Sequence, residues 1–256
     1  MLPSYNEGKK SALKRLQNEL EALNTSTFIV PFSQNDQFIG QEVQLTELEG
    51  KLFASEQTTK IAITGPGGIG KSQLSLELAY RIRHRYKNYS VFWIPASDID
   101  SFHQACAYIA QKLDIPGWDN EKADVKKLVQ LHLSRKSAGH WLLIYDNVDN
   151  INLGSAATLI DYMPQSDLGS IIFTTTNSNT ARRLAAQNII ELSEMIPDAA
   201  QKMLEKYLSN PTLTNKQLET ELLLKELLYL PLAIVQAAAY VNVNNETIRD
   251  YRLLLE

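Results

Sequence analysis

The segment 65–72 reads Gly-Pro-Gly-Gly-Ile-Gly-Lys-Ser and fits the spacing of a phosphate-binding loop, G-x-x-x-x-G-K-[ST]. Glycines let successive backbone N–H groups face phosphate oxygens, and the N-terminus of a following helix adds partial positive charge. Lys71 is expected to reach the β- and γ-phosphates, and Ser72 to offer its hydroxyl to Mg²⁺. The alternative is a glycine-rich turn without a ligand. The expected nucleotide contacts of this segment are Gly67, Gly68, Ile69, Gly70, Lys71, Ser72 and Gln73.

An acidic residue at the end of an apolar run could complete a magnesium site. The run 141–145 is followed by Asp146, and ligands of open parallel sheets bind at the carboxyl ends of the strands. We expect Asp146 to hold Mg²⁺ together with Ser72, and we name Lys71 and Asp146 as the candidate catalytic residues. The alternative for Asp146 is a helix or turn cap. Asp149 is interpreted as a solvated turn residue.

Three threonines, at 174–176, end another apolar run. A polar residue at such a strand end could sense the γ-phosphate, and we assign this role to Thr175. Threonines are also ordinary strand formers, so a purely structural role is the alternative.

A sheet and its helices are needed to position these residues. Short β-rich runs at 60–64, 90–94, 141–146, 170–175 and 188–192 alternate with helical patterns at 42–53, 71–85, 98–113, 122–135, 153–162 and 180–186. This alternation predicts an α/β fold with a parallel sheet covered by helices on both faces. Apolar cores such as 61–63, 142–144 and 171–173 suit strands that are buried on both sides.

The pattern changes after Pro197, where strand signals end and helices are predicted at 198–208, 215–228, 232–241 and 246–255. A leucine stripe at 9–24 predicts a further helix near the N-terminus. Packing on a neighbouring domain is favoured over a short coiled coil, because two heptads are marginal alone. We therefore expect a linker helix at 1–27, an α/β domain at 28–195 and a helical subdomain at 196–256.

Composition excludes several other classes of protein. The chain has 256 residues, is 44% hydrophobic, and carries Lys+Arg 25 against Asp+Glu 29, a net charge of −4. This balance argues against a general nucleic-acid-binding surface, and the basic run 81–87 is interpreted as the cationic end of a helix. The single cysteine, Cys106, excludes a disulfide scaffold and is assigned to the core. Without a long apolar run or a secretory leader, we expect no membrane association and a cytoplasmic location.

In their order along the chain, these motifs resemble those of NB-ARC domains, which belong to the signal transduction ATPases with numerous domains (STAND). The segment 38–42, Phe-Ile-Gly-Gln-Glu, resembles the hydrophobic–hydrophobic–Gly-Arg-Glu element that precedes the phosphate loop. Segments 65–72, 142–149 and 169–176 are similar to the family's Walker A loop, Walker B region and sensor strand. The segment 230–233, Leu-Pro-Leu-Ala, resembles the G-L-P-L element of the helical subdomain. Segments 91–96 and 141–147 look most like those of fungal members.

The resemblance implies a P-loop NTPase sheet in the order 5-1-4-3-2 and a molecular switch, as in plant disease-resistance proteins and the apoptotic protease activating factor. ADP would hold a closed monomer, and ATP with Mg²⁺ would permit self-association and signalling of a larger NLR-like protein of innate immunity or cell death. Its N-terminal effector and C-terminal repeats would lie outside this chain. The implied adenine-side contacts are Phe38, Ile39, Gln41, Pro231 and Leu232.

Four positions depart from the family pattern. Gln41 replaces the usual arginine, Thr176 replaces the sensor arginine, and Tyr229 stands where the first glycine of G-L-P-L is usual. Asn147 follows Asp146 where many members have a second acid, and an amide cannot accept a proton as a general base. We therefore expect at most slow ATP hydrolysis. The alternatives are a P-loop enzyme with real turnover, an ATPase or small-molecule kinase, and a domain locked to one nucleotide.

Overall fold

The computed structural model describes residues 26–52, 58–149 and 158–255. The helix predicted at 9–24 lies outside these ranges. The first half of the helix predicted at 153–162 also lies outside them, and its described end is a 3-10 turn, η2 (Leu159–Tyr162). In the described ranges no helix is both long enough and apolar enough to cross a membrane.

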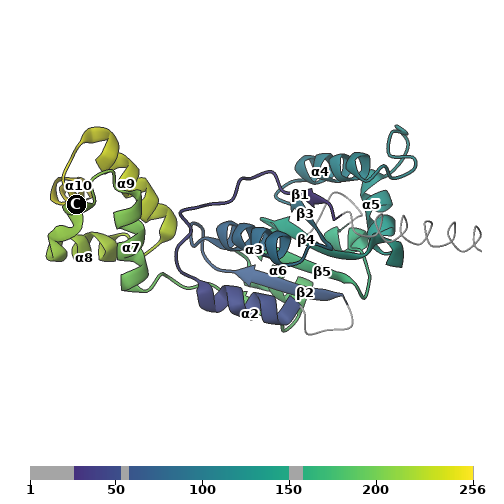
Figure 1. The fold of residues 1–256 in the computed structure, drawn as a ribbon, viewed down its shortest axis with the longest axis horizontal. Coiled ribbons are helices and arrows are strands. Elements are labelled where there is room, and N and C mark those ends of the chain that lie inside the picture. Colours follow the sequence, from purple (N-terminus) through teal and green to yellow (C-terminus); the bar gives the residue numbers. More distant parts are fainter. Residues whose placement is uncertain (1–25, 53–57, 150–157, 256) are drawn as a thin grey trace, which may run out of the picture.

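Six parallel strands form one sheet at the centre of the α/β domain (Figure 1). The strands are β1 (Phe28–Ile29), β2 (Thr59–Thr64), β3 (Tyr89–Pro95), β4 (His140–Asp146), β5 (Gly169–Thr175) and β6 (Ile189–Glu191). Their order is β1-β3-β4-β5-β2-β6. The five predicted strands therefore lie in the expected order 5-1-4-3-2 when read from β6. The short edge strand β1 was not predicted, because only two residues form it and turn-forming residues follow from Pro31.

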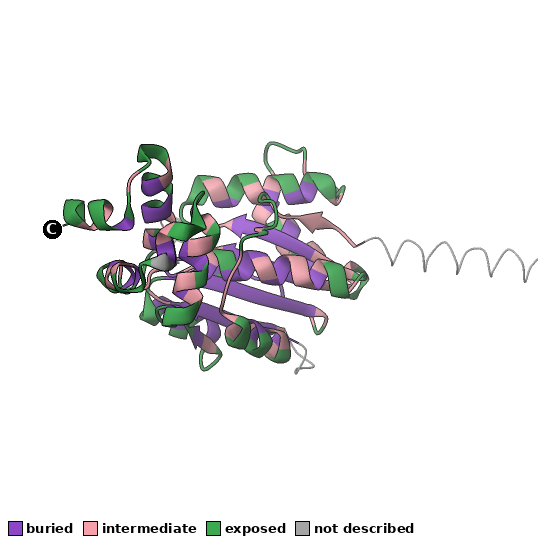
Figure 2. Cartoon of the chain, turned by 60° about the vertical axis from the view of Figure 1, so that its left-hand side comes forward, coloured by how far each residue is buried: buried purple, intermediate pink, exposed green. Residues whose placement is uncertain are grey.

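Helices cover both faces of the sheet and bury it almost completely (Figure 2). On one face lie α2 (Glu42–Leu52) and α3 (Lys71–Arg85). On the other lie α4 (Ile99–Lys112), α5 (Val125–Leu133) and α6 (Ser178–Ala185). Because the strands are apolar on both sides, each face of the sheet has its own core. The phosphate loop lies over the face that carries α3.

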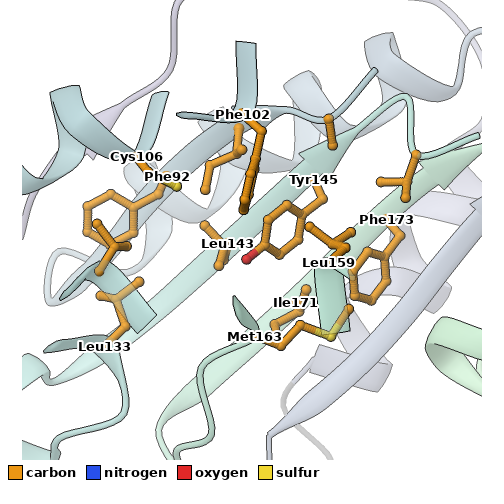
Figure 3. Packing of buried hydrophobic residues seen from close by; sticks show 14 of the residues in the cluster. Phe92, Phe102, Cys106, Leu133, Leu143, Tyr145, Leu159, Met163, Ile171 and Phe173 are labelled. Atoms are coloured by element: carbon orange, nitrogen blue, oxygen red, sulfur yellow. The ribbon is translucent and has the colours of Figure 1, made fainter. Parts of the chain in front are cut away.

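The core beneath α4 and α5 is rich in aromatic side chains (Figure 3). Tyr145 and Phe173 stack with ring centroids 5.6 Å apart, and Phe102 packs on Tyr145. Cys106 lies in this cluster, 2% exposed, and burial raises the pKa of its thiol to about 12. The prediction that Cys106 is a core residue is confirmed.

A separate group of helices follows the sheet and has its own apolar core (Figure 1). It contains α7 (Pro197–Tyr207), η3 (Pro211–Asn215), α8 (Gln217–Glu226), α9 (Pro231–Asn244) and α10 (Ile248–Leu255). Between α8 and α9 the backbone turns through Leu228 and Tyr229, both with φ +52°. Glycine adopts this left-handed conformation at the lowest cost, which explains why the family pattern has glycine at this position. Tyr229 adopts the same conformation at a higher cost.

Candidate nucleotide-binding site

The phosphate loop connects the carboxyl end of β2 to the N-terminus of α3, as the sequence predicted. Gly68 has φ +77°, a conformation that costs other residues about 1–2 kcal/mol. A Cβ on Gly68 would lie 3.1 Å from the Cβ of Leu232, so the loop also approaches the helical subdomain closely. Ile69 is fully buried beneath the loop and serves the core, with its backbone carbonyl as a hydrogen-bond acceptor.

Lys71 begins α3 and is 9% exposed. Its Nζ donates to the carbonyl oxygens of Gly65 at 2.8 Å and Pro66 at 2.9 Å. Burial lowers the pKa of Lys71, while the charges of Asp149 and Asp146 act in the opposite direction. The ammonium group is therefore held within the loop, beside acidic groups that favour its charged form.

Ser72 and Asp146 meet across the sheet edge, as predicted. The Ser72 hydroxyl donates to Asp146 Oδ1 at 2.7 Å, and the Thr174 hydroxyl donates to the same oxygen at 2.6 Å. Thr174 Oγ1 also accepts from the N–H of Asn147, so β5 fixes the turn that follows β4. The oxygen atoms of Ser72 and Asp146 are suitable ligands for Mg²⁺, which proteins hold through one or two carboxylates together with the phosphates of the substrate. Among the described residues no His, Cys, Asp and Glu group of three or more could form a self-sufficient metal site.

Asp149 is more than the solvated turn residue that the sequence suggested. Its Oδ1 accepts from the hydroxyl of Thr175 at 3.0 Å, and from the N–H and hydroxyl of Thr176 at 2.7 and 2.9 Å. Burial alone would raise the pKa of Asp149, but these hydrogen bonds and the charge of Lys71 lower it. The carboxylate therefore ties the end of β5 to the turn after β4.

The threonines at the end of β5 alternate in direction. Thr175 is fully buried and its hydroxyl is used by Asp149, whereas Thr174 and Thr176 line the neighbouring pocket. The structure thus does not bring Thr175 to the pocket with the other predicted contacts. Thr174 is the strand-end residue beside Ser72 and Asp146, because it lies on the face of the sheet that carries α3.

A pocket of about 470 Å³ opens beside the phosphate loop and lies between the α/β domain and the helical subdomain. It brings together the predicted residues Phe38, Ile39, Gln41, Gly67, Gly68, Gly70, Lys71, Ser72, Gln73, Pro231 and Leu232. Its size and its mixture of apolar walls and polar groups suit a small organic ligand. Gln41 reaches under the loop, where its Nε2 donates to the carbonyl of Ile69 at 3.1 Å. Gln41 therefore supports the loop backbone through an amide.

Sequence reasoning missed several residues of the pocket wall. Met203 and Tyr207 come from α7, and Val235 comes from α9. Asn35 also lines the pocket, and its Nδ2 donates to Gln73 Oε1 at 2.8 Å. The four-residue spacing of Met203 and Tyr207 places them on one helix face, but nothing in the sequence says which face of α7 meets the pocket.

The two subdomains are in direct contact at the loop. The N–H of Leu232 donates to the carbonyl of Gly68 at 3.2 Å. A second contact joins the two parts, because Lys206 Nζ donates to the carbonyl of Asp36 at 2.7 Å. A ligand in this pocket would therefore touch both subdomains at once.

Comparison with known proteins agrees with these motifs. The model of the NB-ARC domain family matches residues 41–214. A nucleotide-binding leucine-rich repeat (NLR)-like protein of Hyaloscypha variabilis is 39% identical over 238 residues, which cover 88% of this chain and 24% of that protein. Disease resistance RPP13-like protein 4 of Arabidopsis thaliana is 24% identical over 168 residues, covering 64% of this chain and 19% of that protein. The chain spans about a quarter or less of the length of these curated relatives.

Solved structures share the fold at low sequence identity. The Walker-type ATPase paby2304 of Pyrococcus abyssi superposes with a TM-score of 0.60 at 11% identity, covering 91% of this chain and 75% of that one. The ORC1 protein of Aeropyrum pernix in complex with DNA gives a TM-score of 0.59 at 15% identity, covering 89% and 68%. Identities this low show a common P-loop NTPase-like fold alone. The family match over residues 41–214, more than half of the chain, shows that this chain belongs to the NB-ARC domain family.

Proposed function

We propose that this chain is an adenine-nucleotide-binding switch within a larger NLR-like protein. ADP holds the two subdomains in a closed arrangement, and ATP with Mg²⁺ releases them so that the full-length protein self-associates and signals through segments outside this chain. The role draws on intracellular nucleotide, in keeping with the cytoplasmic location expected from the sequence. The observation that carries the proposal is the pocket wall, which both subdomains build.

The phosphate side of the proposed site comes from the α/β domain. Lys71 supplies a buried positive charge for the phosphates. Its ammonium group, which donates to the loop carbonyls in this structure, would donate to phosphate oxygens instead. Ser72 and Asp146 would hold Mg²⁺, which neutralises phosphate charge when bound. Thr174 keeps the Asp146 carboxylate in place through its hydroxyl.

The base side comes from both subdomains. Phe38 and Ile39 precede α2, while Pro231 and Leu232 begin α9, and all four line the same pocket. We propose that the adenine ring lies between these apolar groups. Pro231 at the start of α9 transmits the presence of the base to the helical subdomain.

We also propose that ATP hydrolysis is slow. Within the described part of the chain, Lys71 is the one lysine or arginine that lines the pocket. Arg182 and Arg183, on α6, are exposed and do not line it. A transition-state arginine can supply about 10³–10⁵ in rate, and Asn147, which does line the pocket, cannot act as a base.

The experiment compares two prolines that each begin a helix of the same subdomain. Pro231 starts α9 and lines the pocket, whereas Pro197 starts α7 and does not. Both are replaced by glycine, and the melting temperature is measured with and without ADP. At a hundredfold excess over Kd, ligand binding stabilises the wild-type native state by about 2.7 kcal/mol.

We expect ADP to raise the melting temperature of wild type and Pro197→Gly equally, and that of Pro231→Gly less. An unchanged ADP effect in Pro231→Gly would show that the base does not touch α9. If ADP did not change the melting temperature of wild type, the assignment of the nucleotide site itself would be contradicted. Rapid multiple turnover of ATP would instead support the P-loop enzyme.

A further inference from the structure

A second groove lies at the edge of the sheet, away from the nucleotide pocket. It runs between the segment 27–31, which contains the edge strand β1, and the side of α4 that carries Gln104, Ala105, Tyr108 and Lys112, and it reaches Trp93 and Pro95 at the end of β3. Its volume is about 650 Å³. We call it the edge groove. Among the described residues, none lines both the edge groove and the nucleotide pocket, so the two are separate sites.

The backbone of β1 leaves hydrogen-bonding groups on its outer edge, and both of its residues line the edge groove. The N–H of Thr27 donates to Ser90 Oγ, and the carbonyl of Thr27 accepts from the N–H of Val91, so both groups of Thr27 face β3. Backbone groups alternate in direction along a strand, which turns those of Phe28 and Val30 to the outer edge. Within the described residues no strand pairs with that edge, since β1 is the last strand of the sheet.

An unpaired edge of this kind is a template for another strand, and α4 leaves room for one beside it. A strand of five residues spans about 17 Å, and the α4 side from Ser101 to Lys112 rises by about the same length. The two walls therefore match a short extended segment. Tyr108, which is 50% exposed, and Ala105 offer apolar surface to its side chains.

Charge distinguishes the two ends of the edge groove. Among the described residues, Lys112 is the one charged side chain that lines it, and the Lys112 Nζ lies 5.3 Å from the ring centroid of Tyr108. Lys112 and Thr27 also line an adjoining pocket of about 360 Å³, whose wall includes Asn88 and Ser137. An acidic side chain at this end would gain a cation together with hydroxyl and amide partners.

We propose that the edge groove binds an extended peptide segment of a partner protein, which adds to β1 as a seventh strand of the sheet. The segment has apolar side chains at alternate positions and an acidic residue at the end beside Lys112. Main-chain hydrogen bonds to Phe28 and Val30 supply affinity, and Lys112 selects the acidic end. Peptide binding at the edge groove is therefore a function separate from nucleotide binding.

The test uses two fluorescein-labelled hexapeptides, Asp-Val-Thr-Val-Thr-Val and the same residues in reverse order. Their binding to the full 256-residue chain is followed by fluorescence anisotropy. One of the two is expected to bind saturably, because strand direction decides which end meets Lys112. The peptide that binds is then N-methylated on each alternate set of amides in turn. Only methylation of the amides that face β1 is expected to weaken binding. The loss should be about tenfold or more, since one charge-neutral hydrogen bond contributes about 1 kcal/mol and at least two are lost.

Matched variants of the chain test the two walls. Gln104→Arg places a large charged side chain on the groove wall, while His103→Arg makes the same change at an exposed neighbour that does not line it. Gln104→Arg should abolish peptide binding, and His103→Arg should preserve it. Lys112→Glu should weaken binding of the acidic peptide and strengthen binding of a peptide that has lysine in place of aspartate. ADP affinity should be the same for all three variants as for wild type, and the melting temperatures of Gln104→Arg and His103→Arg should match each other.

Several results would overturn the proposal. Failure of both hexapeptides to bind would do so, as would equal binding by both N-methylated forms, because strand addition requires one set of amides. Concentration-dependent dimerisation that Gln104→Arg abolishes and the peptide does not inhibit would assign the edge groove to a second copy of this chain. Loss of ADP affinity alone would count against the nucleotide site and leave this test unaffected.

Discussion

Gly68 provides a matched test of how the phosphate loop meets the helical subdomain. Gly68→Ala forces a side chain into φ +77° and brings its Cβ to 3.1 Å from Leu232, whereas Gly67→Ala adds a Cβ with no heavy atom within 4 Å and no positive φ. Both substitutions reduce the entropy of the unfolded chain by about the same amount, so this effect cancels between them. The left-handed conformation leaves a difference of about 1–2 kcal/mol, to which the crowding at Leu232 adds.

The assay is thermal unfolding of both variants without nucleotide, followed by circular dichroism. For a chain of this size, 1 kcal/mol corresponds to about 2–4 °C, so Gly68→Ala should melt about 2–8 °C below Gly67→Ala. The hydrogen bond from the Leu232 N–H to the Gly68 carbonyl should lengthen in the same variant, which weakens the contact between the subdomains. Equal melting temperatures for the two variants would refute the reasoning, because backbone strain and subdomain contact would then be absent at Gly68.

Three further outcomes are expected. Lys71→Met should weaken ADP binding by roughly ten- to a hundredfold, the loss of a charge-assisted contact of about 1.5–3 kcal/mol, while the exposed Lys87→Met should not change the affinity measured by calorimetry. Leu228→Gly should raise the melting temperature, because Leu228 is 64% exposed and has φ +52°; a fall would show that its side chain matters more than its backbone. Cys106, buried with a raised pKa, should react with a thiol reagent only after unfolding, and fast labelling of the native protein would contradict its place in the core.

Local patterns in the sequence predicted the elements that position the site. The phosphate loop, the strand that ends at Asp146 and the order of the five main strands follow from apolar runs, glycine spacing and family resemblance. Ser72 and Asp146 meet at 2.7 Å because the carboxyl ends of parallel strands share one edge of the sheet. These features depend on residues that are close in sequence or on a general rule of sheet topology.

Features that depend on which face meets which element could not be predicted. Thr175 was chosen as the strand-end residue, but Thr174 shares a face with Ile172 and with α3, and this face is known only once the helices are placed. Asp149 gained its role from Thr175 and Thr176, which lie 26 and 27 residues further along the chain. The edge strand β1 has two residues, too few for a periodic signal.

The central claim is that the chain binds adenine nucleotide as a switch and hydrolyses it slowly. The most direct measurement incubates the purified chain with excess Mg-ATP and follows protein-bound and free nucleotide by chromatography over time. We predict that ATP or ADP stays bound near one equivalent, with free ADP accumulating far more slowly than the roughly 1 s⁻¹ low end of ordinary enzymes. Accumulation of many equivalents of ADP at that rate, abolished by Lys71→Ala, would contradict the switch, and retention of no nucleotide would contradict the site.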